Sequence, residues 1–170
     1  MENRHAIVDT QIGEVTLVAA DLDLVGLYFS RHWYKPAVET FGDQVDPETD
    51  PVFSVAAREL GEYFAGTRTS FDIPIHIHGD PFEERVWALV KKIPYGQTVT
   101  YGKLAEQLGD KSLAQDVGQA VGHNPLCVIV PCHRVVGKDG KLTGYAGGLE
   151  RKRFLLDLEE PDESKVGKLF

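Results

Sequence analysis

Apolar and polar residues alternate along the first 30 residues of the chain. The apolar stretches are Ala6–Val8, Val15–Ala19 and Leu24–Phe29. Gly13 and the acidic segment 21–23 separate these stretches, and both contain residue types that favour tight turns. The pattern predicts a three-stranded antiparallel meander between His5 and Ser30.

The pattern changes after residue 30. Residues 31–51 are rich in acids and contain three prolines, which predicts a loop. Apolar residues between 53 and 64 then recur at helical spacing, and Gly66 ends the predicted helix. Residues 71–77 alternate again, which predicts a strand or an extended link. We therefore expect an α+β N-terminal domain over residues 1–78, in which nothing suggests chemistry.

The second half of the chain has helical periodicity. Apolar residues between 82 and 93 repeat every three to four positions until a proline ends the helix. Two shorter helices are predicted over 101–108 and from Ser112 onward, joined by a turn that contains Gly109. Such a pair forms a helix-turn-helix, although many helical pairs share this pattern and never touch DNA. We place this helical domain at residues 79–170.

The segment Val128–Val136 combines a strand pattern with reactive side chains. Its β-branched residues predict a buried strand that ends at Pro131, which has no N–H to donate. Cys132 follows, beside His133 and Arg134, and cationic neighbours favour the nucleophilic thiolate. A buried structural cysteine is the alternative. We favour a working nucleophile because of the two basic neighbours and the proline turn.

The chain has two cysteines, Cys127 and Cys132. Five residues apart on a strand-like segment, they are expected to face opposite sides and to form no disulfide. Free thiols, no export signal and no apolar run of about 20 residues predict a cytoplasmic protein without a membrane segment. His76 and His78 would share one face of a strand, but no cysteine or third histidine lies near them. We expect exposed histidines there and no metal.

The net charge of −8 is unevenly distributed. Residues 1–78 carry 5 basic and 13 acidic side chains, whereas residues 79–153 carry 11 basic and 8 acidic ones. The excess acid therefore lies in the first domain and in the tail, away from the proposed active region. This distribution does not exclude DNA as a partner, but it predicts a modest electrostatic contribution to binding.

Several segments of the second half together resemble one protein family. They are Ile93–Gly96, Tyr101–Ala105, Val117–Gly118, Asn124–Pro125, Pro131–Val135 and Gly144–Gly148. In this order and spacing they resemble the O6-alkylguanine-DNA alkyltransferases, DNA-repair proteins that are consumed by their own reaction. The resemblance extends from Phe82 to Glu159. It implies a ribonuclease H-like fold for the N-terminal domain and a helix-turn-helix that binds double-stranded DNA.

The resemblance assigns the chemistry to five residues. Cys132 is the alkyl acceptor, and His133 is its base, in contact with the thiol through a water molecule. Glu159 holds His133 in the correct tautomer and favours its charged form. Asn124 ties the helix-turn-helix to the active-site strand, and the Tyr101 hydroxyl donates to the flipped base. Judged by residue type alone, the last three would be a solvated acid, a turn residue and a core aromatic.

Further residues are implied for the base and for DNA. The lip Gly144–Gly148 would cover the base, with Tyr145 stacking on it and the Ala146 N–H donating toward O6. The carbonyls of Cys132 and Val135 would accept from the exocyclic amine. The implied contacts are Val135, Tyr145, Ala146 and Gly147 for the base, and Ser112, Gln115, Gly118, Arg134 and Lys138 for DNA. Additional candidates for phosphate contacts are Lys141, Arg151, Lys152 and Arg153, for which a solvated charge is the alternative.

One position departs from the family pattern. Gln115 stands where the family has the arginine that fills the gap left by the flipped nucleotide, and Asp116 beside it has the wrong sign for phosphates. The predicted recognition helix contains no Lys or Arg. Ser112 and Gln115 form a predicted capping box, which explains helix stability but not the loss of the arginine. We expect weaker DNA binding and slower repair than in relatives that have the arginine.

The resemblance implies irreversible transfer of the alkyl group from O6-alkylguanine in duplex DNA to Cys132, with O4-alkylthymine as a minor substrate and no cofactor. One protein molecule is consumed per lesion. We expect a monomer off DNA, with clustering of copies on DNA as an alternative. A non-enzymatic lesion sensor is a second hypothesis, which the intact cysteine argues against. A thiol hydrolase or peroxidatic cysteine is a third, which nothing in the sequence supports.

Overall fold

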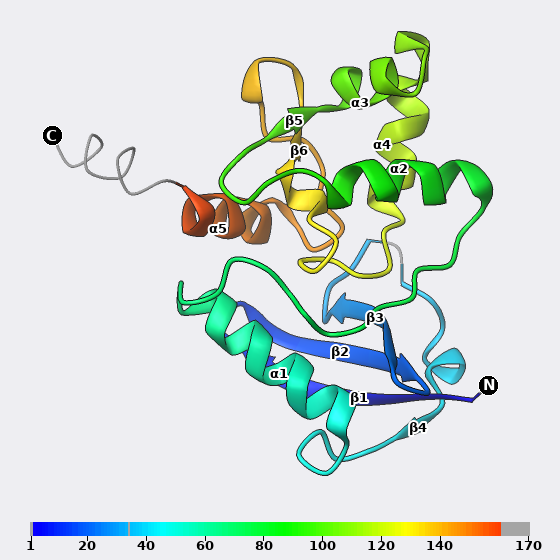
Figure 1. Cartoon of the computed structure of the whole chain (residues 1–170), viewed down its shortest axis with the longest axis vertical. Coiled ribbons are helices and arrows are strands. Elements are labelled where there is room, and N and C mark those ends of the chain that lie inside the picture. The colour runs from blue at the N-terminus through cyan, green and yellow to red at the C-terminus, as the bar shows by residue number, and fades with distance from the viewer. Residues whose placement is uncertain (1, 34, 161–170) are drawn as a thin grey trace, which may run out of the picture.

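The computed structural model describes residues 2–33 and 35–160. Its N-terminal part is a four-stranded sheet in the order β3-β2-β1-β4, with one helix across a face (Figure 1). The strands are β1 (Asn3–Thr10), β2 (Gly13–Ala20), β3 (Asp23–Phe29) and β4 (Asp43–Gln44), and the helix is α1 (Pro51–Phe64). The first three strands are antiparallel neighbours, so the predicted meander is confirmed. The Asp50 side chain caps α1 by accepting from the backbone N–H of Val52.

The segment 31–51 is more regular than the predicted loop. It contains the 3₁₀ helix η1 (Val38–Phe41) and β4, which pairs in parallel with β1. Phe41 is the physical reason, because its buried ring stacks on Tyr28 with 5.3 Å between the ring centroids. That contact holds the segment against the sheet, so its backbone can pair with the edge strand.

Residues 71–77 form an extended link beside β3. The Leu24 N–H donates to the Pro74 carbonyl at 2.9 Å, and the His76 N–H donates to the Leu24 carbonyl at 3.0 Å. Pro74 has no N–H, so the link cannot extend into a regular strand. Of the two predictions for this segment, the extended link is the one observed.

The C-terminal part is mainly helical, as predicted. Its helices are α2 (Pro81–Lys91), α3 (Tyr101–Gln107), α4 (Ala114–Gly122) and α5 (Leu149–Glu159). The shorter elements are β5 (Val99–Thr100), η2 (Lys111–Leu113), η3 (Cys132–Arg134), β6 (Val135–Val136) and η4 (Lys138–Gly140). The helices α3 and α4, joined through η2, form the predicted pair on the side away from the sheet (Figure 1).

The predicted capping box at Ser112 and Gln115 is wrong. The helix α4 begins at Ala114 without a side-chain cap, and the preceding turn is capped by Asp110 instead. The Asp110 carboxylate accepts from both the backbone N–H and the hydroxyl of Ser112, at 2.9 and 2.7 Å. Ser112 lies inside η2, and the residue directly before α4 is Leu113, so the Ser112 hydroxyl is not at the N-cap position.

The predicted strand over 128–131 is also wrong. This segment is a turn in which Val128 has a left-handed backbone with a φ of 75°. Asn124 explains the turn, because its side chain accepts from the Leu126 N–H and donates to the Val130 carbonyl, both at 2.9 Å. A parallel strand pairing forms only after the turn, between β5 and β6.

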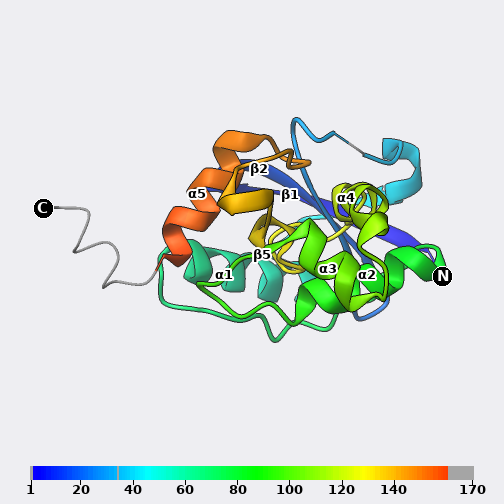
Figure 2. The same cartoon turned by 90° about the horizontal axis from the view of Figure 1, so that it is seen from above.

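One hydrophobic core spans both parts of the molecule. Leu27 and Phe29 of β3 belong to the same buried cluster as Val117 of α4 and Leu155 of α5. In Figure 2 the segment that leads into η3 lies between α4 and α5, above the sheet. The Leu27 N–H also donates to the Pro125 carbonyl at 2.8 Å. The active-site segment is therefore supported directly by the N-terminal sheet.

The domain boundary between residues 78 and 79 remains a proposal. The last ten residues of the second proposed domain, 161–170, lie outside the described residues. No helix in the described part of the chain is long and apolar enough to cross a membrane.

Candidate active site

Cys132 begins the 3₁₀ turn η3 and is 3% exposed. Its backbone N–H donates to the Val130 carbonyl at 2.7 Å, which fixes the residue at the end of the Asn124-closed turn. Cys132 lines a cavity of about 620 Å³ between the helix pair and the segment 143–146. The other lining residues are Trp33, Tyr101, Ala114, Gln115, Gly118, Val121, Gly122, Thr143, Gly144, Tyr145 and Ala146.

A buried ionic network lies behind the cysteine. The Glu159 carboxylate, at the end of α5, accepts from His133 Nε2 at 2.8 Å and from Arg134 Nε and Nη2 at 2.7 and 2.8 Å. The Tyr63 hydroxyl of α1 also donates to Glu159. Burial opposes ionisation, but the hydrogen bonds from His133 and Arg134 prevail and lower the pKa of Glu159 to about 2. The carboxylate is 2% exposed, so the alternative of a solvated C-terminal acid is wrong.

Glu159 favours the charged form of His133, as expected, but burial outweighs this effect. His133 is fully buried, and desolvation lowers its pKa below the ordinary value in spite of the nearby carboxylate. The positive charges of Arg134 and Lys152 add to this lowering, because they repel a charged imidazole. The neutral ring donates from Nε2 to Glu159, which leaves Nδ1 as a lone-pair acceptor. Nδ1 has no hydrogen-bond partner within the described ranges.

The predicted origin of thiol activation also needs correction. The pKa of Cys132 is lowered, first by a hydrogen bond with Cys127 and further by Asn124 and by the positive charge of Lys152, against the effect of burial. Arg134 does not contribute, because its guanidinium is held by Glu159 and by the Ile93 carbonyl at 2.7 Å. The pKa of Cys132 is therefore lowered, as expected, but the residues that lower it are Cys127, Asn124 and Lys152.

The two cysteines do not face opposite sides as predicted. Their Sγ atoms are 3.9 Å apart, too far for a disulfide bond, and both thiols are free. The prediction failed because it assumed a strand between them, whereas the Asn124-closed turn folds Cys127 back beneath Cys132. This turn also connects α4 to the active-site segment, which is the place that the resemblance gives to Asn124.

Tyr101 and Lys152 both form hydrogen bonds with Thr143, which lines the cavity. The Tyr101 hydroxyl at the start of α3 accepts from Thr143 Oγ1 at 3.2 Å, and burial raises its pKa. The Lys152 ammonium of α5 donates to the Thr143 carbonyl at 3.0 Å, and burial lowers its pKa to about 8. Lys152 is buried, so its proposed role as a phosphate contact is wrong.

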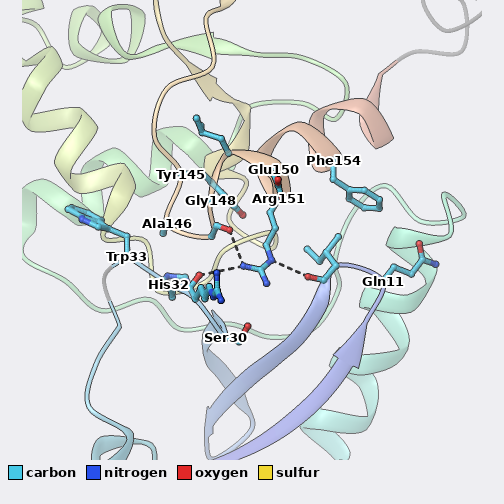
Figure 3. A pocket seen from close by; sticks show the side chains of 14 residues that line it. Gln11, Ser30, His32, Trp33, Tyr145, Ala146, Gly148, Glu150, Arg151 and Phe154 are labelled. Carbon is cyan, nitrogen blue, oxygen red and sulfur yellow. Dashed lines mark hydrogen bonds between the residues drawn. The ribbon is translucent and has the colours of Figure 1, made fainter.

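The lip Gly144–Gly148 is anchored at several points. The Trp33 N–H donates to the Ala146 carbonyl at 2.8 Å, and Arg151 Nη1 donates to the Gly147 carbonyl at 3.0 Å (Figure 3). Arg151 Nε also donates to the Ile12 carbonyl at 3.0 Å, across a second hollow of about 1150 Å³. Arg151 therefore ties the lip to the N-terminal part through Nε and Nη1, and its role as a phosphate contact stays a prediction.

The remaining base-contact candidates lie in different settings. Tyr145 lines the cavity, but its hydroxyl is buried and its ring packs on Phe29 with 6.1 Å between centroids. Val135 is buried in β6, outside the cavity lining, and its N–H donates to the Cys132 carbonyl. The Cys132 carbonyl therefore already has one donor. Gly147 is buried against Phe29, where a side chain would have no room.

The candidates for DNA contact divide into exposed and buried residues. Ser112, Gln115 and Asp116 are exposed on the helix pair, and Lys138 is exposed in η4. Gly118 is half-buried beside the Tyr101 ring. Arg134 is buried in the Glu159 network, so the expectation that it contacts DNA is wrong. Lys141 and Arg153 are also exposed.

Sequence reasoning missed Trp33, Cys127 and Thr143. Trp33 lies in the segment assigned as a loop, yet its ring lines the cavity and stacks on His123 with 5.6 Å between centroids. Gly122 leaves room for the Trp33 ring, because a Cβ atom on residue 122 would lie 2.7 Å from a carbon of that ring. No sequence motif marks these residues: Trp33 and Thr143 depend on contacts with distant segments, and Cys127 depends on a turn that its β-branched neighbours do not predict.

The fold and the site together define a protein that presents a buried thiol to a cavity beside a helix pair. Comparison with protein families identifies the class more closely. Residues 81–161 match the 6-O-methylguanine DNA methyltransferase DNA-binding domain, and residues 3–77 match the ribonuclease-like domain of the same family. The chain belongs to the 6-O-methylguanine DNA methyltransferase family, as the sequence resemblance indicated.

Individual relatives are similar over nearly their whole length. The methylated-DNA–protein-cysteine methyltransferase of Mycolicibacterium paratuberculosis is 46% identical over 155 residues, which are 91% of each chain. The protein of the same name from Methanosarcina acetivorans is 42% identical over 91% of this chain and 97% of its own. The crystal structure of Mycobacterium tuberculosis OGT in complex with DNA superposes with a TM-score of 0.84, at 43% identity and 92% coverage of each chain.

Proposed function

We propose that this protein repairs duplex DNA by transferring the alkyl group of O6-alkylguanine irreversibly to Cys132. The observation that carries the proposal is the Cys132 thiol, which lines the cavity between the helix pair and the anchored lip. Relatives at 41–46% identity are named methylated-DNA–protein-cysteine methyltransferases, and one similar structure contains DNA, which supports the enzyme class and the partner.

The proposed chemistry uses the neutral His133. With Nε2 donating to Glu159, the Nδ1 lone pair can take up the thiol proton through a water molecule. The Cys132 thiolate then attacks the alkyl carbon, a carbon–sulfur bond forms, and the carbon–oxygen bond to O6 breaks. The electron pair of the broken bond stays on guanine, which takes up a proton. The Tyr101 hydroxyl, which lines the same cavity, would donate to the base as that charge develops.

The target base must leave the stack to reach the cavity, because its O6 is not accessible to a buried sulfur in an intact duplex. Gln115 and Gly118 of α4 lie on the cavity rim, where the displaced strand would pass. The thioether that forms is stable, so each molecule acts once and needs no cofactor. O4-alkylthymine would be a minor substrate.

We also propose where the protein is located and how it assembles. The Cys127 and Cys132 thiols are free, with their Sγ atoms 3.9 Å apart. Free thiols are typical of a reducing compartment, so we place the protein in the cytoplasm. We propose that it is monomeric off DNA, and that clustering on DNA would appear as cooperative binding.

Intact-protein mass spectrometry tests this function. The protein is incubated with duplex carrying O6-methylguanine and with an undamaged duplex as the control. We expect a gain of one methyl group, located by peptide mapping on Cys132, and no gain in Cys132→Ser. Binding of the damaged duplex without a mass gain would instead support the lesion sensor, and neither binding nor gain would leave the thiol hydrolase.

A further inference from the structure

The buried Cys127 side chain is the nearest reactive group to the proposed nucleophile. Its Sγ atom lies 3.9 Å from Cys132 Sγ, and both residues are almost completely buried. The mechanism above does not use Cys127, although it lies beneath the sulfur that attacks the alkyl group. A thiol at this distance can donate a weak S–H hydrogen bond, and such a bond is strengthened when the acceptor carries a charge.

The neighbours of Cys127 determine which way its proton points. The His32 Nδ1 atom accepts from the Phe29 N–H at 3.2 Å, so the proton of the neutral ring is on Nε2. Burial keeps His32 neutral, since it lowers the pKa to about 4. The Nε2–H group lies 4.0 Å from Cys127 Sγ and can donate to it. Cys127 therefore receives a donor on one side and must direct its own proton elsewhere.

Two acceptors compete for the Cys127 proton. One is the Asn124 carbonyl, to which the Cys127 thiol donates at 3.9 Å. The other is Cys132 Sγ, which as a thiol donates to Cys127 Sγ at 3.9 Å and becomes an acceptor when it loses its proton. A neutral carbonyl is a weaker acceptor than a thiolate in a buried setting, so the proton turns to Cys132 as that sulfur ionises. The proton remains on Cys127, because the hydrogen bond with Cys132 and then burial raise the pKa of Cys127.

We propose that Cys127 is a positioning residue that stabilises the Cys132 thiolate by donating an S–H hydrogen bond from beneath it. This role rests on the proposed function and explains how the thiol ionises although burial makes His133 a weak base and Arg134 is held by Glu159. Other titratable groups that face Cys132 or Cys127 are Lys152 on α5, Tyr101 on α3, Tyr145 in the lip and His32 after β3. Lys152 and Tyr101 face Cys132, whereas His32 and Tyr145 contact Cys127 itself, so the test includes a variant that keeps a hydroxyl at position 127 beside these two groups.

Two variants separate hydrogen bonding from packing. Cys127→Ala removes the donor, whereas Cys127→Ser retains a hydroxyl that can donate to the thiolate. The readout is the pH dependence of Cys132 alkylation by iodoacetamide, which reports the thiolate fraction without DNA. The Cys132→Ser variant gives the background from Cys127.

We expect Cys127→Ala to move the midpoint of the profile to higher pH and to lower the alkylation rate at pH 7 by about tenfold, which corresponds to one pKa unit. We expect Cys127→Ser to stay close to the wild-type midpoint. Equal shifts in both variants would show that the thiol only fills space, and no shift in either would show that it makes no useful hydrogen bond. Both outcomes overturn the proposal.

The same variants are then compared in methyl transfer from O6-methylguanine duplex. If the wild-type protein transfers the methyl group but the Ala and Ser variants do not differ in midpoint, only the role of Cys127 fails. If the wild-type protein transfers nothing, the proposed function fails whatever the iodoacetamide profiles show. Thermal unfolding of each variant establishes that the comparison is made on folded protein.

Discussion

The two sides of the active-site cavity are built very differently. Behind Cys132, the Glu159 carboxylate is buried and bonded to His133, Arg134 and Tyr63. On the opposite side, the helix α4 presents exposed Gln115 and Asp116 and contains no basic residue. The chemical side has its charged groups paired in a buried network, whereas the α4 side of the cavity has no cation of its own.

This difference separates two properties that act together in repair. A buried network with few free polar groups fixes the reacting atoms with little loss of conformational freedom. Affinity for DNA depends instead on the number of cations that reach phosphates. We therefore expect changes in the network to affect stability and chemistry strongly, and changes on the helix surface to affect mainly the rate of capture.

The largest expected effect comes from Glu159→Gln. The substitution keeps the shape of the side chain but leaves Arg134 buried without its anionic partner. Loss of one partner from a buried ion pair costs about 3–5 kcal/mol. We expect a reduction of that size in the free energy of unfolding by urea, together with slow methyl transfer. Asp157→Asn, an exposed acid on the same helix, is the matched control. Similar small losses in both variants would contradict the role of the network.

The second-largest expected effect is a loss of stability of the wild-type protein in acid. The folded pKa of Glu159, at about 2, lies below its ordinary value of 4.5. Glu159 therefore stabilises the fold fully above pH 4.5, and that stabilisation is lost as the pH falls from 4.5 toward 2. The full contribution is about 3 kcal/mol. We expect the urea midpoint to fall over this interval in the wild-type protein and to fall much less in Glu159→Gln.

The same contrast shows which features could be predicted from sequence. Periodic segments gave the meander and the helices correctly, because a half-buried surface imposes its own spacing. The turn at 124–130 was missed because Val128 adopts a left-handed backbone that β-branched residues rarely accept, and only the Asn124 bonds compensate for it. Residue type could not show that Lys152 is buried or that Arg151 is held, because their acceptors are backbone carbonyls that no side-chain pattern marks.

The DNA-facing side can be strengthened with Gln115→Arg. A guanidinium at this exposed rim position can reach a phosphate or fill the gap left by the flipped nucleotide. We expect methyl transfer from duplex DNA to be faster by about tenfold, which corresponds to 1.4 kcal/mol. The control is Gln119→Arg, which adds the same charge to α4 outside the cavity. Equal gains in both variants would indicate a general effect of charge and would count against the assigned position.

The smallest effect is expected for Lys138→Ala. Lys138 is exposed in η4, and a single surface cation contributes about 0.2–1 kcal/mol to an ionic contact. We expect DNA affinity to weaken about twofold to fivefold, and the slope of log affinity against log salt to become shallower by about 0.9, the value for one lost phosphate contact. Arg58→Ala on α1 is the control, since its exposed side chain lies on the N-terminal part, away from the helix pair (Figure 1). Because a lost phosphate contact changes the salt slope while altered packing does not, an unchanged slope would remove Lys138 from the DNA-binding surface even if affinity fell.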